Sequence, residues 1–241
     1  MSAENAFTKE SLNAFLKELG KEYRKRSGKN MPAEIVLVGG AAILARYGFR
    51  EMTNDIDALV FASSAMKEAI NAVGDRLGLP NNWLNTDFSK TKSFSEKLLE
   101  VSVYYRTFSN ILTIRTVSAE YLIAMKLMSG REYKFDLSDI AGILLEHERS
   151  GKTISLEAID KAVIKLYGSW QTIPEVSQQL LEDAFKSGAY EKVYNEMRKS
   201  EIESKKSLQD FDKTNPGQLK AESIGAILEK ARQKQKSSEA K

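Results

Sequence analysis

The chain has 241 residues, 42% of them hydrophobic, which is enough to bury one substantial core and a smaller second one. It contains no cysteine, which excludes disulfides and zinc sites built from thiolates. The net charge of +3 and the pI near 8.8 are only mildly basic and fall short of the charge typical of a nucleic-acid-binding domain.

The first part of the chain alternates helical and strand patterns. An amphipathic helix, a continuous apolar strand, a Gly-Gly turn with a short helix, a second strand and another helix are predicted over 8–26, 34–38, 39–47, 55–62 and 64–77. The start of the chain lacks the basic-then-apolar pattern of a signal peptide, and the longest apolar run is too short to span a bilayer. We therefore expect a cytoplasmic protein that does not enter a membrane.

The remainder changes from strands to helices. A polar loop over 78–95 precedes a hairpin of two strands, over 98–106 and 111–117. Helical patterns then cover 118–129, 136–149, 155–167, 174–187 and 189–204. Beyond residue 205 the chain is rich in Lys, Glu, Ser and Gln, which predicts a charged, mobile tail with one short helix near 221–233.

These elements predict an α+β fold. A small mixed-sheet α/β core occupies residues 1–117, a helical domain residues 118–204, and the tail residues 205–241.

Two carboxylates stand at the start of the second strand. Asp55 and Asp57 are two residues apart, so in a strand they project from the same face. At the mouth of an apolar strand, such a pair is met by a metal ion, by a lysine or by water. Carboxylates in this arrangement suit Mg²⁺, which keeps some of its waters and completes its shell with phosphate oxygens.

The preceding turn has features of a phosphate site. Gly39 and Gly40 remove two side chains where the backbone approaches an anion, and the helix that follows directs its first N–H groups at that anion. Arg50 and Thr53 lie between the glycines and the carboxylates and are candidate nucleotide-binding residues. Together these residues indicate phosphoryl transfer.

The stretch "GGAAILARYGFREMTNDIDALV" resembles the signature of the polymerase-beta-type nucleotidyltransferase superfamily. In particular, it is similar to bacterial nucleotidyltransferase-like proteins related to the abortive-infection type II toxins. A later stretch, "LIAMKLMSGREYKFDLSDIAGIL", resembles a second motif of these proteins. It contains Lys126, Arg131, Asp136 and Asp139. The resemblance covers roughly residues 33–145.

The resemblance implies a role for each matching residue. Asp55 and Asp57 would hold Mg²⁺ or Mn²⁺, and the glycines would hold the triphosphate of an NTP such as ATP. Lys126 would neutralise phosphate charge. Asp136 is expected to cap the following helix, and Asp139 is a weaker candidate for contact with the site. The reaction implied is transfer of a nucleoside monophosphate (NMP) to RNA or protein, within a toxin–antitoxin or phage-defence pair that includes a partner protein.

One expected residue has no clear counterpart. The superfamily uses a third acid on a later strand as the base for the attacking hydroxyl, and only Glu100 and Asp87 are candidates here. The alternative interpretation is therefore a catalytically inactive nucleotidyltransferase fold that acts as a binding module or antitoxin. We also expect Trp83 and Phe88, in the polar loop, to be available for stacking on a base.

Overall fold

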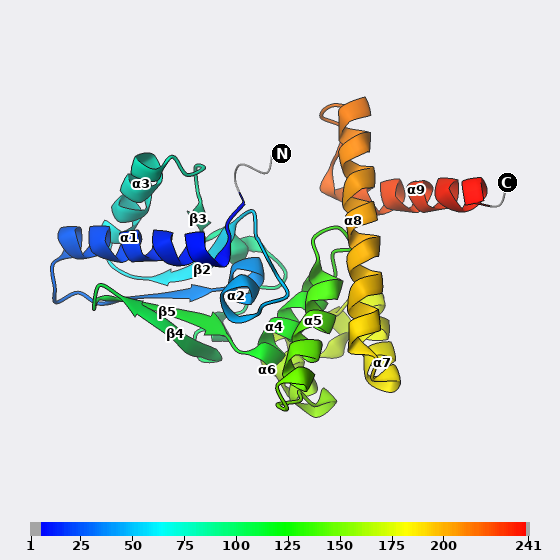
Figure 1. Ribbon diagram of the computed structural model, residues 1–241, viewed down its shortest axis with the longest axis horizontal. Coiled ribbons are helices and arrows are strands. Elements are labelled where there is room, and N and C mark those ends of the chain that lie inside the picture. The colour runs from blue at the N-terminus through cyan, green and yellow to red at the C-terminus, as the bar shows by residue number, and fades with distance from the viewer. Residues whose placement is uncertain (1–5, 240–241) are drawn as a thin grey trace.

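The computed structural model describes residues 6–239 and confirms an α+β fold. Residues 6–117 form a five-stranded mixed sheet with helices on it, called here the α/β half. Residues 118–239 form the helical half, which lies beside one end of the sheet (Figure 1).

The sheet has the strand order β3-β2-β1-β5-β4. Its strands are β1 (Ala33–Leu37), β2 (Ile56–Phe61), β3 (Leu84–Asn85), β4 (Ser102–Phe108) and β5 (Leu112–Val117). The central strand β1 runs antiparallel to β2 and parallel to β5, while β3 pairs with β2 in parallel and β4 pairs with β5 antiparallel. Because β1 is buried on both faces, its sequence is a continuous apolar run.

Three helices cover one face of the sheet: α1 (Lys9–Ser27), α2 (Gly39–Arg46) and α3 (Ala65–Leu77) (Figure 1). The contact with α1 is close, since a Cβ placed on Gly20 would lie 2.9 Å from Cβ of Phe108 on β4. The helix α2 follows β1 directly, which places its first residues at the end of the sheet that carries the aspartate pair.

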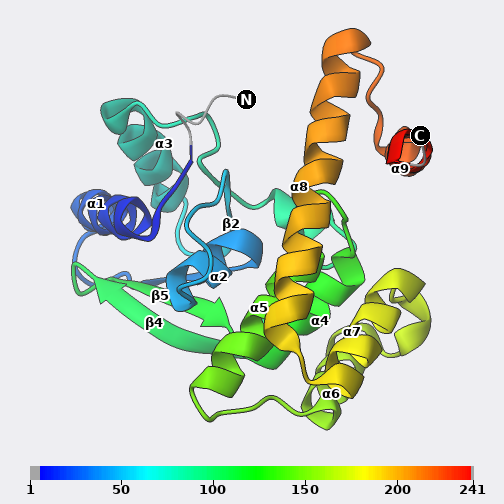
Figure 2. The ribbon, with the colours of Figure 1, turned by 45° about the vertical axis from the view of Figure 1, so that its right-hand side comes forward.

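The helical half contains α4 (Ala119–Ser129), α5 (Asp136–Arg149), α6 (Leu156–Tyr167), α7 (Glu175–Ser187), α8 (Tyr190–Thr214) and α9 (Ile224–Glu239). The helix α8 packs along α5 and then extends beyond the rest of this half, with α9 next to its far end (Figure 2). Within residues 6–239, no helix combines the length and the apolar character that crossing a bilayer requires.

The predicted strand over 98–106 begins later than expected. Leu98 belongs to the short 3-10 helix η3 (Glu96–Leu98), and β4 starts only at Ser102. Leu98 is fully buried, so this apolar run fills the core as a turn instead of joining the sheet. A short apolar run does not distinguish these two outcomes by its pattern.

The predicted helix over 189–204 is also too short. The helix α8 continues to Thr214 because Ser204 and Leu208 are buried. Leu228 on α9 is buried as well, so part of the segment assigned to a charged tail carries packing residues. The mobility of that segment stays a prediction.

Candidate active site

The two aspartates lie at the start of β2, next to the end of β1. Asp55 is exposed and immediately precedes the strand, whereas Asp57 is half-buried within it. The backbone N–H of Val38 donates to the carbonyl of Asp57 at 3.0 Å, which places the carboxylate pair next to the residue that precedes Gly39. The register of β1 and β2 therefore brings the aspartate pair and the Gly-Gly turn together, as the sequence predicts.

Charge around this pair is unbalanced. Burial raises the pKa of Asp57, and the neighbouring charge of Asp55 raises it further, while a hydrogen bond to Asn85 acts in the opposite direction. Within residues 6–239, no salt bridge joins Asp55 or Asp57 to a basic side chain. Two carboxylates held together without a salt bridge to a basic side chain form a site that favours a bound cation.

The Gly-Gly turn is shaped by close approaches. Gly39 has φ +54°, and a Cβ there would lie 3.8 Å from Oδ2 of Asp57. A Cβ on Gly40 would lie 2.6 Å from Oγ1 of Thr53 and 2.9 Å from Nη2 of Arg50. Since Val38 makes no side-chain cap hydrogen bond, the first N–H groups of α2 have no side-chain acceptor there.

Hydrogen bonds of both the backbone and the side chains hold the loop that carries Arg50 and Thr53. Its backbone pairs with the N-terminal segment, because Phe7 and Thr53 exchange two hydrogen bonds of 2.7 and 3.0 Å. The Thr53 hydroxyl donates to the carbonyl of Asp55 at 3.2 Å, and Nε of Arg50 donates to the carbonyl of Met52 at 3.1 Å. Thr53 therefore orients the backbone immediately before the aspartate pair.

A buried chain of ion pairs connects this loop to the helical half. Arg50 contacts Asp139 at 2.5 Å, Lys126 contacts both Asp139 and Asp136 at 2.7 Å, and Arg131 contacts Asp136 at 2.8 Å. These five residues, called here the ion-pair network, contain three cations and two anions. The two aspartates of the network are fully buried.

Pairing determines how these groups titrate. Burial by itself would raise the pKa of Asp136, but the charges and hydrogen bonds of Lys126 and Arg131 outweigh it, and the pKa lies below its ordinary value. Burial likewise acts to lower the pKa of Lys126, yet Asp136 and Asp139 raise it overall. Asp136 and Lys126 are therefore both charged at neutral pH.

The structure gives two residues of the second motif different surroundings from those expected. Asp136 is not the cap of α5, since Phe135 occupies that position and Asp136 is the first helical residue. The side chain of Lys126 is only 6% exposed and is held by two carboxylates. Asp139 reaches the Gly-Gly turn through Arg50.

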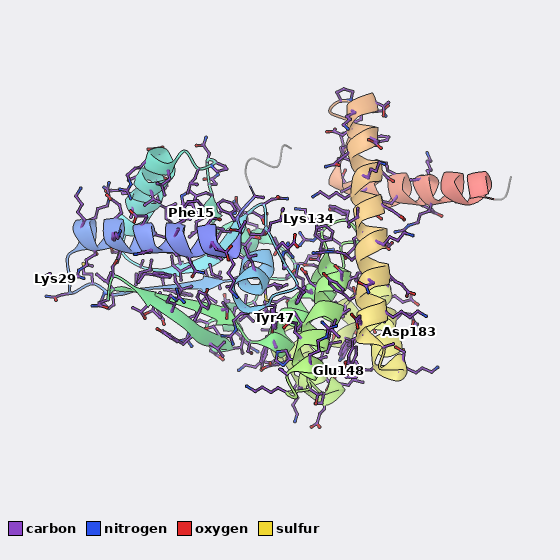
Figure 3. The ribbon with its side chains drawn as sticks, in the orientation of Figure 1. Phe15, Lys29, Tyr47, Lys134, Glu148 and Asp183 are labelled. Carbon is purple, nitrogen blue, oxygen red and sulfur yellow. The ribbon has the colours of Figure 1, made fainter. Side chains whose placement is uncertain are left out.

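Three further residues surround Asp57. Asn85 lies beside it in the register of β2 and β3 and hydrogen-bonds its side chain. Arg131 and Lys134, on the loop over 130–135, are close enough for their charges to act on Asp57. Figure 3 shows Lys134 between the α/β half and α8. In the sequence, these residues are the two basic positions of "GREYK", directly after α4, and they are the signal by which this loop could have been found.

The candidates for a third acid lie elsewhere. Glu100 is in the turn before β4, where its side chain is 67% exposed and 3.4 Å from Lys165. Asp87 lies in the 3-10 helix η2 (Asp87–Lys90), where its side chain is 66% exposed and pairs with Lys90. Neither contacts the aspartate pair.

Strand β5 also offers no third acid on the face of the sheet that carries Asp57. Leu59 shares the face of Asp57 and pairs with Val36, which in turn pairs with Arg115 on β5. The residues of β5 on that face are therefore Thr113, Arg115 and Val117. Among the described residues, no cluster of three or more His, Cys, Asp or Glu side chains is placed to hold a metal ion. A cation at Asp55 and Asp57 would rely on phosphate and water for its remaining ligands.

Two aromatic residues expected at the site belong to the core. Trp83 is 3% exposed, donates from Nε1 to the carbonyl of Ile70 and packs edge-on against Phe15. Phe88 is also buried. The prediction that they are available to stack on a base is wrong, because the polar loop folds back and inserts its aromatic side chains into the core.

Comparison with known proteins assigns the chain to a family. A family model described as "Nucleotidyltransferase of unknown function (DUF6036)" matches residues 14–198, which contain the aspartate pair, the Gly-Gly turn and the ion-pair network. No curated protein and no solved structure matches the chain significantly. Since the match spans most of the sequence, the chain belongs to this family of nucleotidyltransferases of unknown function.

Proposed function

We propose that the protein is a Mg²⁺- or Mn²⁺-dependent nucleotidyltransferase that transfers an NMP from an NTP to a hydroxyl group. The observation that carries the proposal is the aspartate pair, which lies against the Gly-Gly turn and makes no salt bridge to a basic side chain in the part of the chain that the structure describes. Membership in a nucleotidyltransferase family supports it. ATP is the first nucleotide to test.

Each element of the site has a task in this reaction. Asp55 and Asp57 would hold the divalent ion, which supplies charge neutralisation for the phosphates when bound. The N–H groups at the start of α2 hold phosphate oxygens, and Arg131 and Lys134 balance the triphosphate charge from the facing loop. Arg50 and Lys126 act through the ion-pair network, which orients the Gly-Gly turn and the Arg131 side chain.

The chemical step is an in-line displacement. The acceptor oxygen forms a bond to the α-phosphorus while the bond from that phosphorus to the bridging oxygen breaks and pyrophosphate leaves. Since β5 offers no acid on the face of Asp57, the hydroxyl proton passes to water. The acceptor is an RNA or protein hydroxyl, and the resemblance of the motif supports a toxin–antitoxin or phage-defence role with a partner protein.

Calorimetry tests the nucleotide site directly. Wild-type protein is expected to bind ATP in the presence of Mg²⁺ or Mn²⁺, and the Asp55→Asn/Asp57→Asn double variant is expected to lose metal-dependent binding. Asp87→Asn is the matched control, because this exposed carboxylate lies outside the site. If wild type binds none of the four common NTPs with either metal, the proposed function is wrong.

A second function has an observation of its own. The absence of an acid on the Asp57 face of β5 favours a binding module that retains the fold without catalysis, such as an antitoxin. Incubation of the protein with labelled NTPs, total RNA and cell protein separates the two. Label transfer that needs Asp57 supports the enzyme, whereas metal-dependent NTP binding with no transfer to any acceptor supports the binding module.

A further inference from the structure

The junction between the loop over 130–135 and α5 has an unusual backbone. Phe135, the cap residue of α5, adopts φ +62°, a left-handed conformation that is strained for a bulky side chain. Such a conformation persists only where the surrounding structure enforces it. The same short loop carries Arg131, which the ion-pair network connects to Arg50 beside Gly40, and Lys134, which lies between the α/β half and α8 (Figure 3).

The helix α8 supplies the enforcing contacts. The Arg198 guanidinium lies 3.9 Å from the centre of the Phe135 ring, and Nζ of Lys205 lies 5.7 Å from it. One carboxylate oxygen of Glu201 accepts hydrogen bonds from the backbone N–H groups of Leu137 at 2.8 Å and Ser138 at 3.3 Å. Arg198, Glu201 and Lys205 are called here the α8 clamp.

Burial of the Glu201 carboxylate lowers the stability of the folded protein. It is 1% exposed, its Oε2 has no hydrogen-bond partner among the described residues, and no salt bridge to it occurs within them. Burial raises its pKa to about 7, although the two backbone N–H groups act in the opposite direction. An apolar side chain of similar volume would fill this space without that cost. The carboxylate therefore has a role that packing does not explain.

The other end of the loop is fixed as well. Gly130 follows α4 with φ +53°, and a Cβ there would lie 2.7 Å from Oγ of Ser177 and 3.1 Å from Pro174. Between this contact and the α8 clamp, Arg131 is bound to Asp136, the first residue of α5. Moving the start of α5 would therefore move Arg131.

We propose that Glu201 and Arg198 are positioning residues, which hold the loop over 130–135 so that Arg131 and Lys134 face Asp57. This inference rests on the proposed function, in which these two cations contact the triphosphate. Glu201 and Lys205 lie beyond residue 198, where the family match ends. The clamp therefore extends the site into a part of α8 that the family resemblance does not cover.

Two variants of equal size separate positioning from packing. Glu201→Met fills the space without an acceptor, whereas Glu201→Gln keeps an acceptor oxygen for the N–H groups of Leu137 and Ser138. In Glu201→Met, amide hydrogen exchange over residues 131–138 is expected to be about tenfold faster than in wild type. Glu201→Gln and the control Glu203→Gln, at an exposed position on the same helix, are expected to match wild type.

Kinetics connects the loop to the site. With labelled ATP as the donor, Glu201→Met is expected to raise KM for ATP about tenfold with little change in kcat, because it misplaces groups that bind the triphosphate. Glu201→Gln is expected to restore the wild-type KM. If Glu201→Met does not fold, Arg198→Met, which removes the cation from the Phe135 ring, is tested in the same way.

Several outcomes would overturn the inference. It fails if exchange over 131–138 is unchanged, or if exchange in β1 rises equally, which indicates general destabilisation. It also fails if the loop loosens while KM stays at the wild-type value. If wild type neither binds nor transfers a nucleotide, the proposed function fails separately, and the exchange measurement alone decides whether Glu201 holds the loop.

Discussion

The chain contains two pairs of aspartates in opposite surroundings. Asp55 and Asp57, in the α/β half, make no salt bridge within residues 6–239, and burial together with their mutual repulsion raises the pKa of Asp57. Asp136 and Asp139, in the helical half, are fully buried and bound to Lys126, Arg50 and Arg131. The same side chain therefore serves as a candidate ligand in one pair and as a structural anion in the other.

The comparison shows that contact with a cation reverses the effect of burial on the pKa of a carboxylate. Asp136 is more deeply buried than Asp57, yet its pKa is lowered because two cations contact it. Glu201 is also deeply buried but makes no salt bridge within residues 6–239, and burial raises its pKa to about 7. A buried carboxylate without a cation is a group whose charge the fold does not compensate.

The largest expected effect comes from breaking the structural pair. Asp136→Ala leaves the buried Lys126 with one carboxylate in place of two and releases Arg131. Removing one partner from a buried ion pair costs about 3–5 kcal/mol, and we expect a loss of this size in the free energy of unfolding by urea.

The matched control for that variant is Asp87→Ala. Asp87 pairs with Lys90 at 2.8 Å, but both side chains are mostly exposed. An exposed pair contributes about 0–1 kcal/mol, so this variant should unfold at nearly the wild-type urea concentration. Equal losses in the two variants would show that the network does not stabilise the helical half.

The two pairs also differ in how well the sequence predicts them. The fold class, the central strand and the meeting of Asp57 with the Gly-Gly turn follow from local patterns and their order along the chain. The partners of Lys126 do not, because they depend on how α4, α5 and the loop over 47–55 pack in space. The contact of Glu201 with Leu137 spans 64 residues and has no local signal.

Glu201 extends the comparison to pH. Its pKa is about 7 in the folded protein against an ordinary value of 4.5, so the unfolded chain loses this proton first as the pH rises. The fold favours the protonated carboxyl of Glu201, and its contribution to the free energy of unfolding is complete below about pH 4.5. This contribution is lost as the pH rises through about 7. The total is about 3–4 kcal/mol, because each unit of difference between the two pKa values corresponds to roughly 1.4 kcal/mol.

Urea unfolding of wild type and Glu201→Gln at several pH values isolates the contribution of Glu201 to the pH dependence of stability. Glutamine does not titrate, so the wild-type free energy of unfolding should fall relative to that of the variant between about pH 4.5 and pH 7. Parallel curves would mean that the pKa of Glu201 is the same in the folded protein and in the unfolded chain. A wild-type free energy that rises relative to the variant would mean that the fold stabilises the charged carboxylate, as it does for Asp136.

Gly40 tests the contact between the α/β half and the ion-pair network. Gly40→Ala places a Cβ 2.6 Å from Oγ1 of Thr53 and 2.9 Å from Nη2 of Arg50, so both side chains must move. Overpacking of this kind costs about 1–3 kcal/mol, and we expect weaker ATP binding as well. Gly225→Ala on α9 is the control, since its Cβ meets nothing within 4 Å and the substitution should be neutral or slightly stabilising. Similar results for both glycines would remove the steric argument.

The smallest expected change in stability is the most informative about Asp57. Asp57→Asn removes a half-buried charge that Asp55 repels, and an amide can keep a hydrogen bond with Asn85. We expect the free energy of unfolding at neutral pH to stay constant or to rise by less than about 1 kcal/mol, while metal-dependent ATP binding is lost. A loss of stability as large as that of Asp136→Ala would mean that the fold holds Asp57 as a structural anion. A stable variant without nucleotide binding would instead identify a carboxylate that the fold tolerates for its function, because residues selected for chemistry commonly oppose stability.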